Sequence, residues 1–123
     1  MILVDTSVWI DHLAHGNARL QTLLEDGEVL THPYVTGEIA LGSLPRRQET
    51  LSALQALPAI DIASADEAMA FLHGEQLFGM GIGYVDLHLL AATRLEPAAR
   101  LWTRDKRLLQ AAVKLELAAF DKH

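Results

Sequence analysis

Four acidic residues stand where elements of secondary structure are expected to begin or end: Asp5, Glu38, Asp86 and Asp105. Asp5 ends an apolar run that starts at Ile2, and Asp105 lies two residues past the segment Arg100 to Thr103. We expect Glu38 and Asp86 in the first turns of two helices. In a parallel sheet flanked by helices, such positions lie outside the carboxyl ends of the strands. The sequence therefore predicts that the four side chains share one rim of the sheet.

Four carboxylates on one rim would repel each other strongly unless a cation neutralised them. Hard oxygen ligands favour Mg²⁺ or Mn²⁺ over zinc or iron. Such an ion lowers the pKa of a bound water, orients it for in-line attack and stabilises charge on a phosphoryl transition state. This chemistry needs no side-chain nucleophile, and the sequence contains no Cys, no Gly-x-Ser-x-Gly elbow and no Gly-Lys-Ser/Thr phosphate loop.

Each acid taken alone also has a simpler interpretation. Asp and Glu are common helix caps and first-turn residues, where they interact favourably with the positive end of the helix dipole. Spacing in the sequence does not separate a set of four caps from a set of four converging ligands, so both interpretations stay open at this point.

The elements that must position these acids alternate along the chain. We expect strands at residues 2–4, 28–31, 59–63, 100–103 and 116–120, and helices at about 6–13, 17–26, 36–44, 46–57, 64–78, 84–95 and 105–114. The glycine-rich run Gly79 to Gly83 reads as a connector. Alternation of strands and helices predicts an α/β fold, a three-layer sandwich around a mainly parallel sheet of four to five strands. We expect one domain over residues 1–123.

The composition agrees with such a domain. The 123 residues are 50% hydrophobic and 21% charged, which is typical of a globular protein, and Leu and Ala together supply 40 of them. The longest uncharged stretch, residues 50–60, is too short for a membrane span, which needs about 17 residues or more. The chain opens on Met-Ile-Leu-Val-Asp with no basic region, so we expect no signal peptide and a soluble, cytoplasmic protein.

The net charge of −6 is unevenly distributed. Residues 1–86 carry three Lys or Arg against twelve Asp or Glu, whereas residues 87–123 carry seven against four. This asymmetry fits an acidic site beside a basic, phosphate-binding surface, and it also fits an ordinary solvated surface.

The segments around the four acids resemble the motifs of one known family. They read VDTSVWID at residues 4–11, TGEIALG at 36–42, GYVDLHLLAA at 83–92 and LWTRDKRL at 101–108. In this order they are similar to the motifs of PIN-domain ribonucleases, and the short chain is most similar to the VapC toxins of bacterial and archaeal toxin–antitoxin modules. The resemblance covers essentially the whole chain.

The resemblance implies a divalent-metal-dependent endoribonuclease that acts as a toxin. In it, Asp5, Glu38, Asp86 and Asp105 would hold Mg²⁺ or Mn²⁺ and help to activate the attacking water. Thr103 would support the metal shell, and Ser7 or Thr6 would steady the first acid or a bound water. The implied partners are an RNA substrate (transfer or ribosomal RNA in the family), a second copy of the chain in a homodimer, and a cognate antitoxin whose tail blocks the acidic pocket.

Several other residues then acquire expected roles. Six cations are candidates for binding RNA phosphates, with Arg104 and Lys106 the strongest because they flank Asp105: Arg46, Arg47, Arg100, Arg104, Lys106 and Arg107. We expect Trp9 and Trp102 in the core and the six histidines, including His123, in core or surface positions rather than as metal ligands. Some leucines of the first helices exceed what one core needs, which favours a dimer interface or an antitoxin groove: Leu20, Leu23, Leu24, Leu41, Leu44 and Leu51.

Three other functions compete with the ribonuclease. A haloacid-dehalogenase-like phosphatase needs a second Asp two residues after the first, where this chain has Ser7. A phosphoacceptor receiver domain needs adjacent acids near the first strand and a lysine after the last, which this chain lacks. A catalytically silent RNA- or protein-binding module of the same fold is the principal alternative, and the intact set of four acids favours the ribonuclease over it.

Overall fold

Three short parallel strands form the centre of the computed structural model, which describes residues 1–120. Strand β1 (Ile2–Val4) lies between β2 (Val29–Leu30) and β3 (Arg100–Trp102). Leu3 is in register with a leucine on each side, and all three leucines are buried. A continuous apolar run of this kind is typical of a parallel strand covered on both faces. Residues 121–123, and with them His123 and the end of the expected domain, lie outside the described residues.

The sheet is narrower than the four to five strands expected from the sequence. Of residues 59–63 only Ala59 pairs, forming one parallel bridge with Thr31, and of residues 116–120 only Ala118 pairs, with Leu101. The amide of Ile60 donates to the Thr31 carbonyl at 2.8 Å, after which the chain turns away. Both segments therefore extend the parallel order β2-β1-β3 by a single bridge at each edge, without becoming strands.

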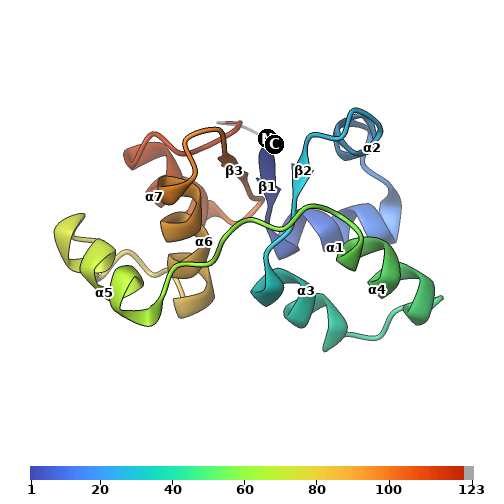
Figure 1. Ribbon diagram of the computed structural model, residues 1–123, viewed down its shortest axis with the longest axis horizontal. Helices are drawn as coiled ribbons and strands as arrows, with labels where there is room; N and C mark the ends of the chain where they lie inside the picture. Colours follow the sequence, from blue (N-terminus) through green and yellow to red (C-terminus); the bar gives the residue numbers. More distant parts are fainter. Residues whose placement is uncertain (121–123) are drawn as a thin grey trace.

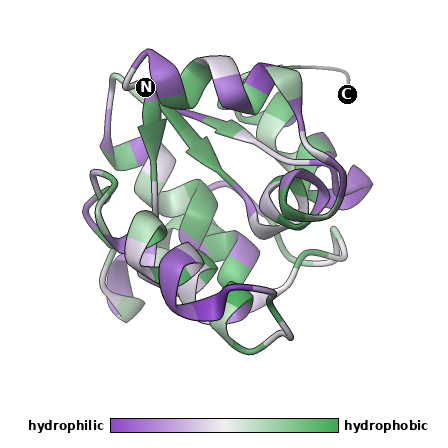
Figure 2. Ribbon diagram, turned by 90° about the vertical axis from the view of Figure 1, so that its right-hand side faces the viewer, coloured by the Kyte–Doolittle hydropathy of each residue, from purple (hydrophilic) through white to green (hydrophobic). Residues whose placement is uncertain are grey.

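Seven helices surround the strands within the described residues, and Figure 1 shows α1 to α4 toward one side of them and α5 to α7 toward the other. The bounds are α1 Thr6–His15, α2 Ala18–Glu25, α3 Pro33–Ala40, α4 Arg47–Gln55, α5 Ala65–Gly74, α6 Tyr84–Leu95 and α7 Lys106–Lys114. This arrangement confirms the α/β class. Hydrophobic residues fill the strands while the outer helices mix both kinds (Figure 2). No helix in the described part of the chain is long and apolar enough to cross a bilayer.

Two helices differ from their predicted bounds in ways that affect the site. Helix α3 begins at Pro33, not at Thr36, because proline suits the first helical position and the His32 side chain accepts a hydrogen bond from the Tyr34 amide. Glu38 therefore lies in the second turn, not in the first as expected. Helix α5 ends at Gly74, since Gln76 adopts a left-handed backbone conformation with φ of 54°.

Helix α6 is the most deeply buried helix described. Every residue from Leu87 to Thr93 is buried, and the helix packs against β3 and α5. Trp9 and Trp102 are each only 4% exposed, which confirms their expected place in the core. The rigid packing of α6 fixes the position of its first turn, where Asp86 lies.

Candidate acidic metal site

Asp5 occupies the junction between β1 and α1, at the centre of the sheet. It stands at the cap position of α1, yet its carboxylate makes no side-chain cap bond to that helix. Instead, its Oδ2 accepts hydrogen bonds from the hydroxyl groups of Thr103 at 2.7 Å and Ser7 at 2.8 Å. The Asp5 side chain is thus held in place by hydroxyl groups from two segments.

Thr103 connects two of the acids. It is buried, directly after β3, and its Oγ1 donates to Asp5 while accepting from the Asp105 amide at 3.0 Å. Ser7 is tied to the same segment, because its Oγ accepts from the Arg104 amide at 2.9 Å. These contacts fix the loop after β3 against the start of α1, and the supporting role of Thr103 and Ser7 toward a metal stays a prediction.

Glu38 is joined to the site by Thr6. The Thr6 hydroxyl donates to Glu38 Oε1 at 2.7 Å, across the contact between α1 and α3. The sequence left open whether Ser7 or Thr6 steadies the first acid. In the structure Ser7 donates to Asp5, whereas Thr6 donates to Glu38.

Asp86 and Asp105 each use one oxygen as a helix cap. Asp86 Oδ2 accepts from the Gly83 amide at 3.1 Å at the start of α6. Asp105 Oδ1 accepts from the Leu108 amide at 2.9 Å at the start of α7. The capping interpretation is therefore correct for these two acids, although it accounts for only one oxygen of each.

All four carboxylates share this pattern of one tethered and one untethered oxygen. Among residues 1–120, no protein group bonds to Asp5 Oδ1, Glu38 Oε2, Asp86 Oδ1 or Asp105 Oδ2, and none of the four acids forms an ion pair with Lys, Arg or His. The four side chains are thus fixed in position with their negative charge left uncompensated.

The charges of the four acids act on one another. Burial raises the pKa of the Asp86 carboxyl above its ordinary value, the Gly83 amide opposes that rise, and the negative charges of Asp5, Asp105 and Glu38 raise the pKa further. The other three acids therefore lie close enough to Asp86 for their charges to act on its carboxyl.

An all-oxygen set with excess negative charge fits a hard divalent cation. Within the described residues, however, no three acidic or histidine side chains are grouped closely enough to enclose an ion. Like charges favour separation, and each acid is held back by the one oxygen that bonds to the protein. The donor chemistry therefore fits a divalent ion, and the untethered oxygens are the ones available to it.

The buried hydroxyl of Thr103 should be essential to this geometry. We expect Thr103→Val to lower the free energy of unfolding by about 1–2 kcal/mol, because it removes a donor to Asp5 and an acceptor for the Asp105 amide. Thr103→Ser keeps the hydroxyl and is the matched control. Urea unfolding of the three proteins gives the comparison, and a loss in Thr103→Ser with none in Thr103→Val would show that packing of the methyl group matters instead of the hydroxyl.

The six candidate cations are not equivalent in the structure. Arg47 donates to the carbonyls of Ala40 and Gly42, and Arg100 donates to the Glu116 carbonyl, so both have structural roles. Arg46 pairs with Glu49 at 2.6 Å. The remaining three lie at or just after the loop that carries Asp105, and all are exposed: Arg104, Lys106 and Arg107.

The sequence analysis missed Asp11 as a residue of this region. Its Oδ2 lies 3.3 Å from the Arg104 guanidinium, next to the loop after β3. Asp11 follows Ser7 by one turn of α1, so the two share a helix face, and Ser7 also contacts Arg104. The four-residue spacing of Ser7 and Asp11 is the feature of the sequence that could have indicated this contact.

Comparison with known proteins defines the class to which this fold and site belong. Residues 2–114 match the PIN domain family. The chain is also 46% identical over 118 residues to "Ribonuclease VapC32" of Mycobacterium tuberculosis strain CDC 1551 / Oshkosh, a match that covers 96% of this chain and 95% of the relative. The protein of the same name from strain ATCC 25618 / H37Rv matches to the same extent. The chain therefore belongs to the PIN domain family and, within it, to the VapC ribonucleases.

Proposed function

We propose that this protein is an RNA-cleaving hydrolase, the toxin endoribonuclease of a toxin–antitoxin pair, and that Asp5, Glu38, Asp86 and Asp105 form its active site. The observation that carries the proposal is the set of four fixed carboxylates, each with one untethered oxygen and none with an ion-pair partner in the described residues. The match to ribonucleases over nearly the whole chain supports the same assignment.

A divalent ion, Mg²⁺ or Mn²⁺, would be held by the untethered oxygens of the four acids. When bound, such an ion supplies a water of lowered pKa and stabilises the charge that develops on the phosphate. The chain's own residues set the geometry. Thr103 and Ser7 orient the Asp5 carboxylate, Thr6 orients Glu38, and the first turns of α6 and α7 orient Asp86 and Asp105.

Cleavage of RNA is tested directly with the purified protein and total cellular RNA. We expect fragments in the presence of Mg²⁺ or Mn²⁺ and none with EDTA, and calorimetry should detect binding of the ion itself. Binding of the ion without cleavage of any RNA would favour the silent binding module over the ribonuclease.

Arg104 should bind an RNA phosphate near the cleaved bond. It adjoins Asp105 and is 45% exposed at its side chain, with only a surface pair to Asp11 to displace. We expect Arg104→Ala to weaken RNA binding about three- to tenfold and to reduce the slope of log affinity against log salt by about one. Lys114→Ala, at the far end of α7, removes the same charge away from the acids and should leave the slope unchanged. An unaltered slope in Arg104→Ala would discard this role.

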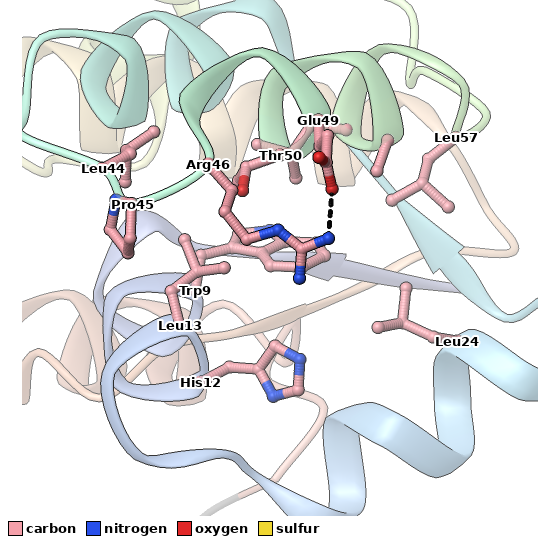
Figure 3. Close-up of a pocket in the computed structure, with 12 residues that line it drawn as sticks. Trp9, His12, Leu13, Leu24, Leu44, Pro45, Arg46, Glu49, Thr50 and Leu57 are labelled. Carbon is pink, nitrogen blue, oxygen red and sulfur yellow. Dashed lines mark hydrogen bonds and ion pairs between the residues drawn. The ribbon is translucent and has the colours of Figure 1, made fainter.

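A cognate antitoxin is the partner that we propose, and two neighbouring depressions offer it a surface. The first, of about 430 Å³, lies between α1, α2 and α4, with Trp9, Leu13, Leu24 and Leu57 in its lining (Figure 3). The second shares Leu13 and Leu44 with it and extends to Glu38. An apolar segment lying in both would end at the acids, where a basic side chain of the partner would block them.

The leucines singled out in the sequence divide between core and surface. Leu20 is fully buried, Leu24 and Leu44 line the first depression, and Leu41 is 89% exposed. A homodimer and a cytoplasmic location stay predictions. Light scattering of the protein with and without its antitoxin tests the assembly.

A further inference from the structure

Two tyrosines lie on the same helices that carry two of the acids. Tyr34 lies on α3 one turn before Glu38, and Tyr84 begins α6 two residues before Asp86. Residues four apart in a helix share a face, so Tyr34 and Glu38 lie on the same side of α3. Both rings are exposed for such large side chains, Tyr34 by 37% and Tyr84 by 54%.

A buried histidine holds the two tyrosines together. The His88 ring meets the Tyr34 ring at a centroid distance of 5.1 Å and the Tyr84 ring at 4.7 Å, both close to perpendicular. His32 adds a further contact, with its ring centroid 4.8 Å from that of Tyr34. Edge-to-face packing of this kind is favourable and fixes the orientation of the rings. The aromatic cluster thus joins α3 to α6 with one side open.

Within the part of the chain that the structure describes, hydrogen bonding accounts for one contact of the cluster, the bond from the Tyr34 amide to the His32 ring. Among the described residues, His88 is 1% exposed with both ring nitrogens unpartnered, and neither tyrosine hydroxyl bonds to a protein group. Burial, and secondarily His88, lowers the pKa of His32 to about 4, so that imidazole is neutral near pH 7. The histidines therefore serve as aromatic supports, and nothing in residues 1–120 covers the exposed tyrosine rings.

A cation lies against the connector that leads into Tyr84. Gly81, in the connector before Tyr84, has φ of +78°, and the Arg107 side chain packs against it. A Cβ atom at Gly81 would lie 2.8 Å from both Cδ and Nη1 of Arg107, so the absence of a side chain there makes room for the guanidinium group. No ion pair involves Arg107 in the described part of the chain.

We propose that Tyr34 and Tyr84 form a stacking site for unpaired bases of the RNA beside the cleaved phosphate, with Arg107 binding a neighbouring phosphate. The inference rests on the proposed ribonuclease function and assigns the residues that would contact bases of its substrate. Bases in a duplex are already stacked on each other, whereas unpaired bases can stack on aromatic side chains irrespective of sequence. The site thus selects single-stranded RNA and loops over duplex.

Binding of a short adenosine-rich RNA that contains 2-aminopurine tests the site. The wild-type protein in EDTA, which prevents cleavage, should bind the single strand more tightly than the corresponding duplex and quench the 2-aminopurine fluorescence on stacking. We expect Tyr34→Leu and Tyr84→Leu each to weaken single-strand binding about tenfold, whereas Tyr34→Phe and Tyr84→Phe stay within about twofold of wild type. Thermal melts of all variants establish that they are folded.

Each other result overturns the stacking site. Single-strand binding that is unchanged in the Leu variants would discard it, as would equal affinity of the wild type for single strand and duplex. If the Leu variants turn a dimer into a monomer in light scattering, the tyrosines cover a protein interface instead. A wild type that cuts RNA while the Leu variants bind normally refutes the stacking site alone. A wild type that neither binds nor cuts RNA refutes the proposed function as well.

Discussion

Replacing Asp5 by asparagine should abolish RNA cleavage while the protein keeps its fold. An asparagine can still accept the hydrogen bonds of Thr103 and Ser7 through its single oxygen, but this places an NH₂ group where the untethered carboxylate oxygen stood. An NH₂ group cannot bind a cation. Because a bound divalent ion is worth several kcal/mol in the transition state, we expect the cleavage rate to fall at least about 100-fold.

The measurement compares initial cleavage rates of one RNA at saturating Mg²⁺, together with thermal melts. Asp66→Asn is the matched control, since Asp66 is an exposed acid in the first turn of α5 and has no contact with the four acids. It should cut RNA at the wild-type rate. Asp5→Asn also removes a buried charge without an ion-pair partner in the described residues, so its melting temperature should not fall. Loss of activity with a marked loss of stability would mean that Asp5 has a structural role.

The positions of Asp5, Asp86 and Asp105 could be predicted because each depends on local pattern, whereas Glu38 was expected one turn too early in its helix. Asp5 directly follows a run of three apolar residues, Asp86 stands one residue before Leu87 in an apolar helical segment, and Asp105 stands three residues before Leu108 in another. The end of a strand and the start of a helix can be recognised from such short segments. Parallel topology then places the ends on one rim.

The contacts that orient the acids could not be predicted, because they join distant segments. The bond from Thr6 to Glu38 depends on how α1 packs on α3, and the bond from Thr103 to Asp5 depends on the register of β1 with β3. Residues 59–63 and 116–120 were expected to be strands, and each forms only a single bridge, for a related reason. Their alternating or apolar pattern is compatible with a strand, but the direction of the chain after the first bridge decides whether pairing continues.

The aromatic cluster shows a different limit of sequence reasoning. His88 lies two residues from Asp86, and helical spacing correctly indicates that the two side chains point apart. The same spacing puts His88 one turn after Tyr84, on a shared face, but nothing in the sequence brings Tyr34 to that face. Only the packing of α3 beside α6 creates the contact of Tyr34 with His88.

Asp86→Asn should raise the melting temperature of the metal-free protein, by about 2–4 °C. Burial and the three neighbouring acids disfavour the charged form of Asp86, which is why its pKa is raised. Asparagine removes the charge and can still accept the hydrogen bond from the Gly83 amide, so the start of α6 keeps its cap. A lower melting temperature in EDTA would mean that the carboxylate stabilises the helix more than the other acids repel it.

The pH dependence follows from the same shift. Because the pKa of Asp86 is higher in the folded than in the unfolded chain, the folded state binds more protons in the interval above the ordinary value of 3.8. The stability of the wild type therefore falls as pH rises through that interval and stays lower above it. The advantage of Asp86→Asn should thus be present at neutral pH and vanish below about pH 3.8, where Asp86 is uncharged in both states.

Added Mg²⁺ should reverse the order of the two proteins. A ligand that binds only the folded state stabilises it more the tighter it binds, and the wild type offers one more carboxylate than the variant. We expect millimolar Mg²⁺ to raise the melting temperature of the wild type above that of Asp86→Asn at neutral pH. If the melting temperatures of the two proteins run parallel as Mg²⁺ is added and do not change order, the acids repel each other without holding an ion.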